Sequence, residues 1–335
     1  MKVLKILAAI LACAAMVGAA QAQAIKVRLA VGGKPSLFYL PLTVAERLGY
    51  FKDEGLDVEI SDFPGGAKAL QALVGGSADV VTGAYDHIVQ MRAQNQPVIG
   101  LVEIGQFPGY ALGLSPAKAS AYSGPKDLKG LKIGITAPGS STHFMVKYIM
   151  ARAGLSPDDA SYIGVGASAS AVAAARRGEI DGLVNTDPVI TLLENDGLIK
   201  VVADTRTLEG TRKVYGGAYT AAVLYAQPQF VERNPKAAQG LANAFVRALK
   251  WVKGHGPEEI AQVMPEEFAI GNKALYVQSI RNSVPMYSPD GRFGHEGAET
   301  AYKVLAAFDP AVKAIKIDVA TTYDERYVDK ANAGQ

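Results

Sequence analysis

The sequence predicts an α/β protein built from two similar lobes, and three observations support this. Segments typical of strands alternate with segments typical of helices, which is the pattern of mainly parallel sheets. The order of these segments repeats once along the chain. The composition is that of a globular protein, since 49% of the 335 residues are hydrophobic and 20% are charged. This length suits about two domains.

The first 24 residues are typical of a signal peptide. Lys2 and Lys5 precede an uncharged, mostly apolar run over 6–20, and a small-x-small cleavage site follows. A membrane anchor is disfavoured because the run is short for a bilayer, which takes about 20 residues. Cys13 lies within this run, so the mature chain would hold no cysteine, no disulfide and no thiolate metal site.

The charge balance excludes some classes of partner. Without Lys2 and Lys5, the 34 basic residues of the chain become 32, which equals the number of acidic residues. No long basic run is present. We therefore expect neither nucleic acid nor an anionic membrane surface as a partner.

The first part of the mature chain alternates between strands and helices. Short apolar or alternating runs predict strands, and longer segments that end at glycine predict helices. The predicted strands cover 25–31, 56–60, 79–82 and 98–103, and the predicted helices cover 37–48, 67–74 and 88–94.

The next part repeats this order. Strands are predicted over 131–135, 162–165 and 181–184, and helices are predicted from the turn at 139–143 to Arg152 and over 169–177. Six residues match at one constant offset: Ala67, Ala69, Leu70, Ala72, Gly76 and Asp79 correspond to Ala169, Ala171, Val172, Ala174, Gly178 and Asp181. We interpret the shared Gly-x-x-Asp ending as the result of a duplication.

Two crossovers divide the chain into lobes. The segment 107–110 leads into a strand at 111–114, and 215–217 leads into a returning strand at 218–226. After Pro235, apolar residues at helical spacing predict one long amphipathic helix, and further helices are expected near 260–264, 274–283 and 298–308. We predict that residues 25–110 and 218–335 form the first lobe and that residues 111–217 form the second.

A cleft between two such lobes is the expected binding site. Ligands of parallel sheets lie beyond the carboxyl ends of the strands, where helix N-termini point. The turn Gly139-Ser-Ser-Thr-His143 has the spacing of neither a nucleophile elbow nor a phosphate loop. Ser140, Ser141 and Thr142 could bind an anion at the helix start, or they could simply cap the helix.

A glycine-rich turn offers a competing interpretation. Gly164–Ala169 matches the Gly-x-Gly-x-x-Gly/Ala dinucleotide fingerprint, and Asp187 follows at a suitable distance. We disfavour an oxidoreductase because the motif lies in the second half of a repeat and an exported protein rarely meets soluble nicotinamide cofactors. The alternative is close packing at the cleft, with Ser168 as a polar contact.

Other polar residues follow the third strand of each half. Tyr85-Asp86 and Asn185-Thr-Asp187 occupy equivalent positions there and are candidate specificity groups or ordinary turn residues. His143 is a candidate hydrogen-bonding partner of a ligand. No two histidines have metal-ligand spacing, so we expect no metal and no cofactor.

Four stretches resemble a known family. They are "YLPLTVAERLGYFKDEGLDVEI" (39–60), "GGAKALQALVGGSADVV" (65–81), "GSSTHFMVKYIMARAGL" (139–155) and "GVGASASAVAAARRGEIDGLVNTDP" (164–188). They are similar to periplasmic substrate-binding proteins of ABC importers, in the nitrate/sulfonate/taurine and thiamine-pyrimidine (NMT1/THI5-like) branch.

This resemblance implies a type II periplasmic binding protein fold and a ligand closed between the lobes. It also implies a periplasmic, monomeric, non-enzymatic protein that delivers its ligand to an inner-membrane permease. The family's pocket loops fall on Lys34, Ser36, Phe38, Tyr39, Gly66, Ala67, Tyr85, Asp86, Ser140, Ser141, Thr142, His143, Gly166, Ser168, Asn185 and Asp187.

The resemblance leaves the ligand open. Sulfonate and nitrate binders use the hydroxyls at the helix start for the anionic head, which fits Ser140–Thr142. Asp86 and Asp187 would repel a small bare anion, so either they point away or the ligand also carries a donor group. We expect a small organic anion, of the sulfonate, taurine or aromatic carboxylate type. A pyrimidine ligand, an enzyme on the same fold and a sensor module are the alternatives.

Overall fold

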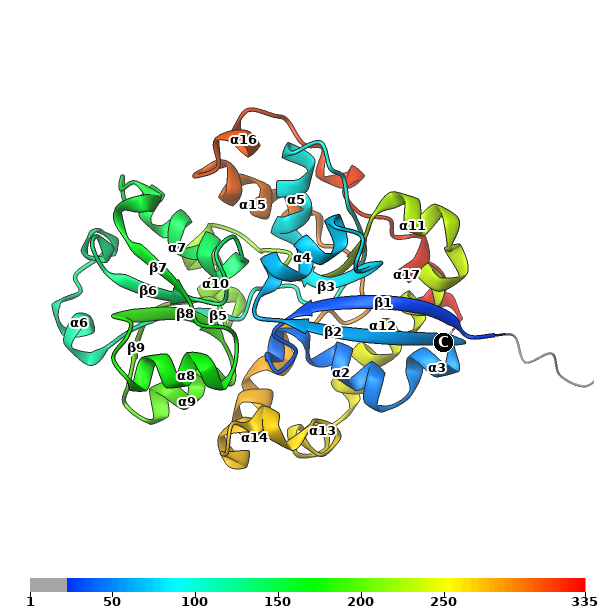
Figure 1. Cartoon of the computed structure of the whole chain (residues 1–335), viewed down its shortest axis with the longest axis horizontal. Coiled ribbons are helices and arrows are strands. Elements are labelled where there is room, and N and C mark those ends of the chain that lie inside the picture. The colour runs from blue at the N-terminus through cyan, green and yellow to red at the C-terminus, as the bar shows by residue number, and fades with distance from the viewer. Residues whose placement is uncertain (1–22, 335) are drawn as a thin grey trace, which may run out of the picture.

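Two five-stranded sheets organise the protein. The computed structural model describes residues 23–334 and places the two sheets side by side, each with helices on its faces (Figure 1). The strand order is β2-β1-β3-β10-β4 in the first lobe and β7-β6-β8-β5-β9 in the second. This arrangement is a mixed α/β fold of two lobes, as the sequence predicts.

The first-lobe sheet contains β1 (Ile25–Gly32), β2 (Leu56–Phe63), β3 (Val80–Ala84), β4 (Ile99–Glu103) and β10 (Ala222–Ala226). The second-lobe sheet contains β5 (Tyr110–Leu114), β6 (Lys132–Ile135), β7 (Ser161–Gly164), β8 (Gly182–Thr186) and β9 (Lys200–Asp204). In each sheet the strand that enters from the other lobe, β10 or β5, runs antiparallel to both neighbours. The other observed pairs are parallel.

Helices surround both sheets. The helices of the first lobe are α2 (Leu40–Arg47), α3 (Tyr50–Asp53), α4 (Gly66–Val74), α5 (Tyr85–Ala93), α11 (Pro228–Arg233), α12 (Pro235–Gly254), α13 (Pro257–Val263), α14 (Lys273–Ser283), α15 (His295–Ala306), α16 (Pro310–Lys313) and α17 (Arg326–Ala333). The remaining helices are α6 (Pro116–Ala121), α7 (Ser141–Arg152), α8 (Ala169–Arg176), α9 (Val189–Asn195) and α10 (Leu208–Tyr215). Short 3-10 turns cover Leu37–Tyr39, Pro125–Leu128, Pro157–Asp159, Glu266–Ala269, Val284–Met286 and Val319–Thr321.

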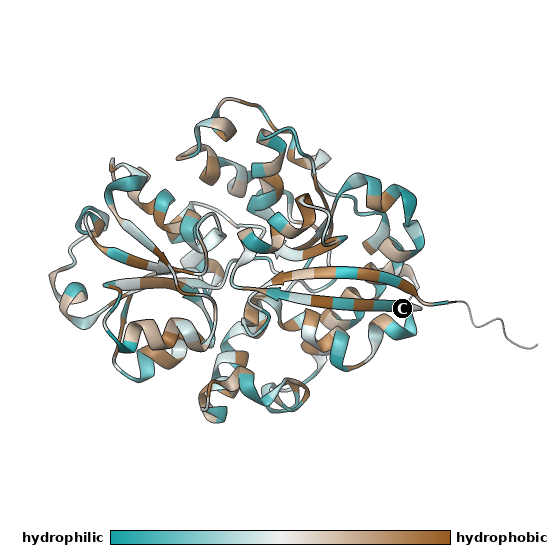
Figure 2. Ribbon diagram, in the orientation of Figure 1, coloured by the Kyte–Doolittle hydropathy of each residue, from teal (hydrophilic) through white to brown (hydrophobic). Residues whose placement is uncertain are grey.

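Hydrophobic burial explains the layers. Every residue of the central strands β3, β10, β8 and β5 is buried, whereas the edge strand β7 is largely exposed. Figure 2 shows hydrophobic residues concentrated on the strands and on the inner sides of the helices. The predicted apolar positions of α12 are all buried: Ala238, Leu241, Phe245, Ala248, Leu249 and Val252. Their helical spacing therefore buries one face of α12 against the first lobe. Among residues 23–334, no helix combines the length and apolar character needed to cross a membrane.

The two lobes share an equivalent aspartate hydrogen bond as well as an order of strands and helices. Asp79, which ends the Gly-x-x-Asp motif of the first lobe, accepts a hydrogen bond from the backbone N–H of Arg28 at 2.8 Å. Asp181 accepts one from the backbone N–H of Lys132 in the second lobe, also at 2.8 Å. In both lobes the aspartate thus ties the turn after a helix to the neighbouring strand. This equivalence supports the predicted duplication.

The crossovers between the lobes run side by side. Residues 104–109 lead from β4 to β5, and residues 205–221 lead from β9 through α10 to β10. The backbone N–H of Gly109 donates to the carbonyl of Thr205 at 3.1 Å, and that of Ala221 donates to the carbonyl of Gly105 at 2.9 Å. Hinges usually lie at a few loop residues in such connections between lobes.

Glu103 is buried next to these crossovers. It ends β4, is only 3% exposed, and accepts a hydrogen bond from the backbone N–H of Gly294 at 3.2 Å. Burial raises the pKa of Glu103 to about 8, although hydrogen bonds from Thr220 and Gly294 oppose this shift. At neutral pH the carboxyl group is therefore mainly protonated in the folded protein and ionised in the unfolded chain.

We expect Glu103→Gln to reduce the pH dependence of stability. The folded protein holds a proton that the unfolded chain releases above its ordinary pKa of 4.5. The stabilising contribution of this proton is fully present below that pH and is lost as the pH rises through about 8. The slope is at most about 1.4 kcal/mol per pH unit. Urea unfolding between pH 5 and pH 8 should therefore show a smaller loss of free energy for the variant.

The exposed Glu266 provides the matched control. Glu266→Gln should keep the slope of the wild type. If the wild type and Glu103→Gln lost the same free energy of unfolding over this range, Glu103 would be ionised in the folded protein and the prediction would be wrong.

Candidate functional site

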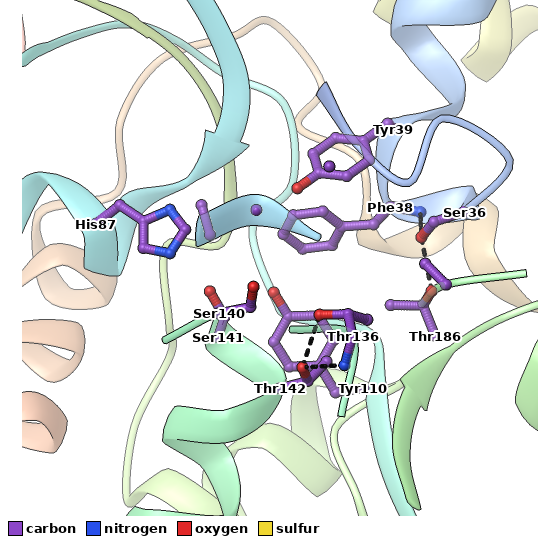
Figure 3. Close-up of a pocket in the computed structure, with 14 residues that line it drawn as sticks. Ser36, Phe38, Tyr39, His87, Tyr110, Thr136, Ser140, Ser141, Thr142 and Thr186 are labelled. Carbon is purple, nitrogen blue, oxygen red and sulfur yellow. Dashed lines mark hydrogen bonds between the residues drawn. The ribbon is translucent and has the colours of Figure 1, made fainter. Parts of the chain in front are cut away.

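A cavity lies between the two lobes (Figure 3). The first lobe contributes Gly32, Ser36, Phe38, Tyr39, Gly66, Ala84 and His87. The second sheet and its loops contribute Tyr110, Thr136, Ser140, Ser141, Thr142, Ala167 and Thr186. The space left for the centre of a water-sized group is ≈ 20 Å³, which is about the space that one water needs. The lobes are therefore closed around a small site.

Strand ends and helix starts place these residues. Gly32 ends β1, Ala84 ends β3 and Thr186 ends β8, all at carboxyl ends of strands. The helix α4 begins at Gly66 and α7 begins at Ser141, so both helices direct their N-terminal ends toward the cavity. The first backbone N–H groups of a helix lack partners within the helix and favour negative charge. The fold thus brings donors from both lobes to one space.

Hydrogen bonds join the two lobes around the cavity. They link Ser36 Oγ to Thr186 Oγ1 at 2.6 Å, the Leu37 N–H to the Asp187 carbonyl at 2.9 Å, the Ala67 N–H to Ser140 Oγ at 3.0 Å and Ser141 Oγ to Asp86 Oδ1 at 2.8 Å. In each pair one residue belongs to the first lobe and the other belongs to the second lobe. These bonds therefore form only when the lobes are together. They stabilise the closed form specifically.

Asp86 is a buried carboxyl group in this interface. It is 1% exposed, and its two oxygens accept hydrogen bonds from Ser141 Oγ at 2.8 Å and from the Tyr219 hydroxyl at 3.3 Å. Burial raises the pKa of Asp86, whereas His87 and the two hydroxyl donors lower it. Each oxygen of Asp86 already has a hydroxyl partner. The carboxyl group therefore links the lobes and leaves no oxygen free for a ligand.

Aromatic rings form another part of the lining. The Phe38 ring meets the Tyr39 ring edge-on with centroids 4.9 Å apart, and it lies 5.3 Å from the Tyr110 ring. Burial raises the pKa of both tyrosines, so their hydroxyls stay neutral at physiological pH and can donate or accept hydrogen bonds. This part of the cavity suits an apolar or planar portion of a ligand.

The lining carries many hydroxyl groups but no lysine or arginine among the described residues. Lys34, which the sequence analysis places near the site, has its Nζ 2.6 Å from Glu46 Oε2 and is engaged there. An anionic group in the cavity would therefore be held by hydroxyl groups and by the N-terminal ends of α4 and α7. No basic side chain would be needed for this.

Part of the predicted site residue set lines the cavity: Ser36, Phe38, Tyr39, Gly66, Ser140, Ser141 and Thr142. Ala67 and Asp86 lie next to the lining and form hydrogen bonds with it. The backbone N–H of Ala67 donates to Ser140 Oγ, and the carboxyl group of Asp86 accepts from Ser141 Oγ. Both therefore position hydroxyls of the lining.

The predicted residues after β8 brace the loops. The Asn185 side chain donates to the Gly166 carbonyl at 3.0 Å and accepts from the Thr186 N–H at 2.9 Å. Asp187 Oδ1 accepts from the Thr191 N–H at 2.8 Å. Burial raises the pKa of Asp187, and the nearby arginine at position 206 opposes this shift. The hydrogen bonds of Asn185 and Asp187 thus stabilise the loops that form the cavity wall.

The other predicted residues lie outside the lining set. The Tyr85 hydroxyl is 2.7 Å from Thr322 Oγ1. His143 Nδ1 accepts from the Gly139 N–H at 3.1 Å. Ser168 precedes α8 and makes no side-chain cap hydrogen bond there. Tyr85 is thus engaged within the protein, whereas His143 is engaged only through Nδ1, since its buried Nε2 has no hydrogen-bond partner among the described residues.

The lining also includes residues that the sequence analysis did not name singly as site residues, of which Ala167 and Thr186 belong to the predicted loops: Gly32, Ala84, His87, Tyr110, Thr136, Ala167 and Thr186. Thr186 shows one reason. The strand β8 continues to Thr186, and successive side chains of a strand point to opposite faces. The Asn185 side chain therefore points away from the side that Thr186 faces, and Asp187 lies in the turn after the strand. Thr136 directly follows the strand β6. Its position after a strand could have marked it as a candidate site residue.

A family profile covers most of the chain. The family described as NMT1/THI5 like matches residues 38–260. The chain belongs to this family. The resemblance that the sequence analysis identified is thereby confirmed.

Relatives of this NMT1/THI5-like protein include binding proteins. YtlA of Bacillus subtilis (strain 168), named as a binding protein, is 25% identical over 260 residues, which cover 76% of this chain and 75% of the relative. The taurine-binding periplasmic protein of Escherichia coli (strain K12) is 26% identical over 254 residues, with 72% and 73% covered.

Solved structures share the fold. A protein of Bordetella bronchiseptica RB50 is 50% identical, with a TM-score of 0.90 and coverage of 92% of this chain and 97% of that chain. The alkanesulfonate-binding protein SsuA of Xanthomonas axonopodis pv. citri is 18% identical, with a TM-score of 0.68 and coverage of 91% and 99%. The predicted periplasmic binding protein fold is confirmed.

Proposed function

We propose that the protein is the solute-binding component of an ABC uptake system. It captures a small organic anion, of the sulfonate, taurine or aromatic carboxylate type, and delivers it to a membrane permease. The cavity between the lobes carries this proposal, because hydroxyl and backbone N–H donors from both lobes converge on it. The binding proteins among its relatives support it.

Capture follows from the contacts across the cavity. A ligand that touches both lobes gains all of its contacts only in the closed form, so binding shifts the population toward that form. The hydrogen bonds between the lobes, such as Ser36 to Thr186, contribute to the same form. The permease then recognises the closed protein.

The proposed organisation is that of an exported, monomeric protein. Residues 1–24 act as the signal peptide and direct the chain to the periplasm, and residues 1–22 lie outside the described residues. Residues 25–110 and 218–335 form the first lobe, and residues 111–217 form the second lobe with its crossovers.

A second candidate ligand class is a pyrimidine or related heterocycle. The rings of Phe38, Tyr39 and Tyr110 in the lining favour it, because aromatic rings stack on planar ligands. A 4-amino-5-hydroxymethyl-2-methylpyrimidine phosphate synthase of Candida albicans (strain WO-1) is 24% identical over 244 residues, which cover 71% of this chain and 70% of that protein. We propose a binding role rather than an enzymatic one, since no nucleophile or metal motif was found in the sequence.

Thermal shift of the mature protein tests the proposal. The panel contains sulfonates, aromatic carboxylates, nitrate, pyrimidines and amino acids. A ligand present at 100 times its dissociation constant adds about 2.7 kcal/mol of stability, which raises the melting temperature by several degrees. A hit among the organic anions supports the main proposal, and a hit confined to pyrimidines supports the second. Turnover of a compound on the panel, or no shift with any of them, contradicts a binding role for these ligands.

A further inference from the structure

A buried histidine faces the cavity with one unpartnered ring nitrogen. His87 lies in the first turn of α5 and is 0% exposed. Figure 3 shows its imidazole directed into the cavity from the side opposite Ser36 and Thr186. Among the described residues, no group forms a hydrogen bond with His87 Nδ1. A buried polar atom without a partner is costly, so its retention in a binding cavity points to a partner from the ligand.

The other ring nitrogen determines what Nδ1 can do. His87 Nε2 lies 3.3 Å from the carbonyl oxygen of Gly139. A carbonyl oxygen only accepts, so Nε2 carries the hydrogen. Burial lowers the pKa of His87 and outweighs the opposing effects of Asp86 and Gly139, which keeps the ring neutral. A neutral ring has one N–H, so Nδ1 carries a free lone pair on a ring that lines the cavity.

The second lobe orients this ring. Gly139 belongs to the loop before α7, and the Phe144 ring of α7 lies edge-on to the imidazole with centroids 6.0 Å apart. Both contacts come from the lobe opposite α5, so closure holds the imidazole in place. On its own lobe, Gly66 leaves room beside the ring, because a Cβ at that position would lie 3.0 Å from His87 Cε1.

We propose that His87 Nδ1 is the specificity-determining acceptor of the site and selects anions that also carry an N–H or O–H donor. This inference rests on the proposed function and narrows its ligand class. Nitrate offers only acceptors and would leave Nδ1 unpaired in the closed form. A hydroxyl or amide group elsewhere on an organic anion would pair with it. Sites built to hydrogen-bond a ligand donor discriminate strongly against analogues that lack it.

Two matched ligand pairs of equal charge test this inference. Isethionate and ethanesulfonate differ by one hydroxyl group, as do 4-hydroxybenzoate and benzoate. Within whichever pair the wild type binds, we expect it to bind the hydroxylated ligand at least about tenfold more tightly than the ligand without the hydroxyl group. Isothermal titration calorimetry measures both affinities. Nitrogen-15 spectra of the wild type should also show a protonated Nε2 and an Nδ1 signal that shifts when the hydroxylated ligand is added.

Two variants of His87 separate its two nitrogens. His87→Gln places an amide near the Nε2 position, so it can still donate to Gly139 but has no acceptor at the Nδ1 position. His87→Asn places an acceptor near the Nδ1 position. We expect the preference for the hydroxylated ligand to disappear in His87→Gln and to persist in His87→Asn. Because closure affects both members of a pair equally, the ratio of their dissociation constants reports on Nδ1 alone.

The outcomes distinguish the inference from the function on which it rests. Equal affinities within a bound pair, or a preference that His87→Gln retains, overturn the role of His87 and leave the binding function intact. If none of the four compounds binds the wild type, the proposed ligand class fails and the inference fails with it.

Discussion

Replacing Gly65 by alanine is expected to weaken ligand binding by about 5- to 150-fold without disturbing the fold. A Cβ at position 65 would lie 2.9 Å from the Cβ of Ala137 and 3.0 Å from Ser140 Oγ, and both of these residues belong to the second lobe. Overpacking of this kind costs about 1–3 kcal/mol, and this cost corresponds to the stated change in affinity. The lobes relieve the contact by parting, so the cost falls on the closed form.

The backbone allows a clean test of this effect. Gly65 is extended, with φ of −170°, so alanine adopts the same conformation without strain. Affinity is measured by calorimetry with the ligand found by thermal shift, and the radius of gyration is measured by X-ray scattering. We expect the variant to need more ligand before it becomes compact. Its ligand-free melting temperature should stay the same or rise slightly, since alanine restricts the unfolded chain.

Gly124→Ala is the matched control for Gly65→Ala. Gly124 is also extended, with φ of 172°, and a Cβ there would meet nothing within 4 Å. This variant should bind like the wild type. If Gly65→Ala also bound with wild-type affinity, the lobes would not close through the contact between Gly65 and Ala137.

Removal of the Ser141 hydroxyl is the second change with a large expected effect. Ser141 Oγ donates to Asp86 Oδ1 at 2.8 Å across the lobe interface, and the carboxyl group is buried. Removing one partner of a buried hydrogen bond costs about 1–3 kcal/mol, so Ser141→Ala should raise the dissociation constant by about 5- to 150-fold. The closed form loses this bond, whereas the open form does not have it.

A double-mutant cycle separates this role from direct contact with the ligand, because Ser141 also lines the cavity. Asp86→Ala removes the acceptor, so the hydrogen bond between Ser141 and position 86 is absent in that background. In that background, Ser141→Ala should cost clearly less affinity than in the wild type. An equal cost in both backgrounds would show that Ser141 acts on the ligand alone, and the bridge between the lobes would contribute nothing.

The candidate site was only partly accessible to sequence analysis. The hydroxyls at 140–142 stand out because a polar turn follows a strand and precedes a helix, and these three residues line the cavity. Thr186 lies between Asn185 and Asp187, the two residues of this turn that the resemblance places in the pocket. The predicted strand ends at 184, whereas β8 continues to Thr186, whose side chain lies on the face of the strand opposite to that of Asn185.

His87 and Tyr110 were harder to recognise for a different reason. Neither belongs to a motif, and each reaches the cavity through the placement of a whole element. His87 lies one residue beyond the polar pair that the sequence analysis selected, on the side of α5 that faces Gly139. Tyr110 ends the first crossover and begins β5, so its position depends on how the lobes are joined.

Local patterns were sufficient for the order of the elements, the repeat of the two lobes and the buried face of α12. These features depend on hydropathy and turn residues within short segments. The antiparallel direction of β5 and β10 and the pairing of Asp86 with Ser141 depended on the packing of the whole chain. So did the contact of His87 with Gly139, whose residues are 52 positions apart in the sequence. Such contacts join residues that are far apart in the sequence, and no short-range periodicity encodes how these distant segments are placed relative to one another.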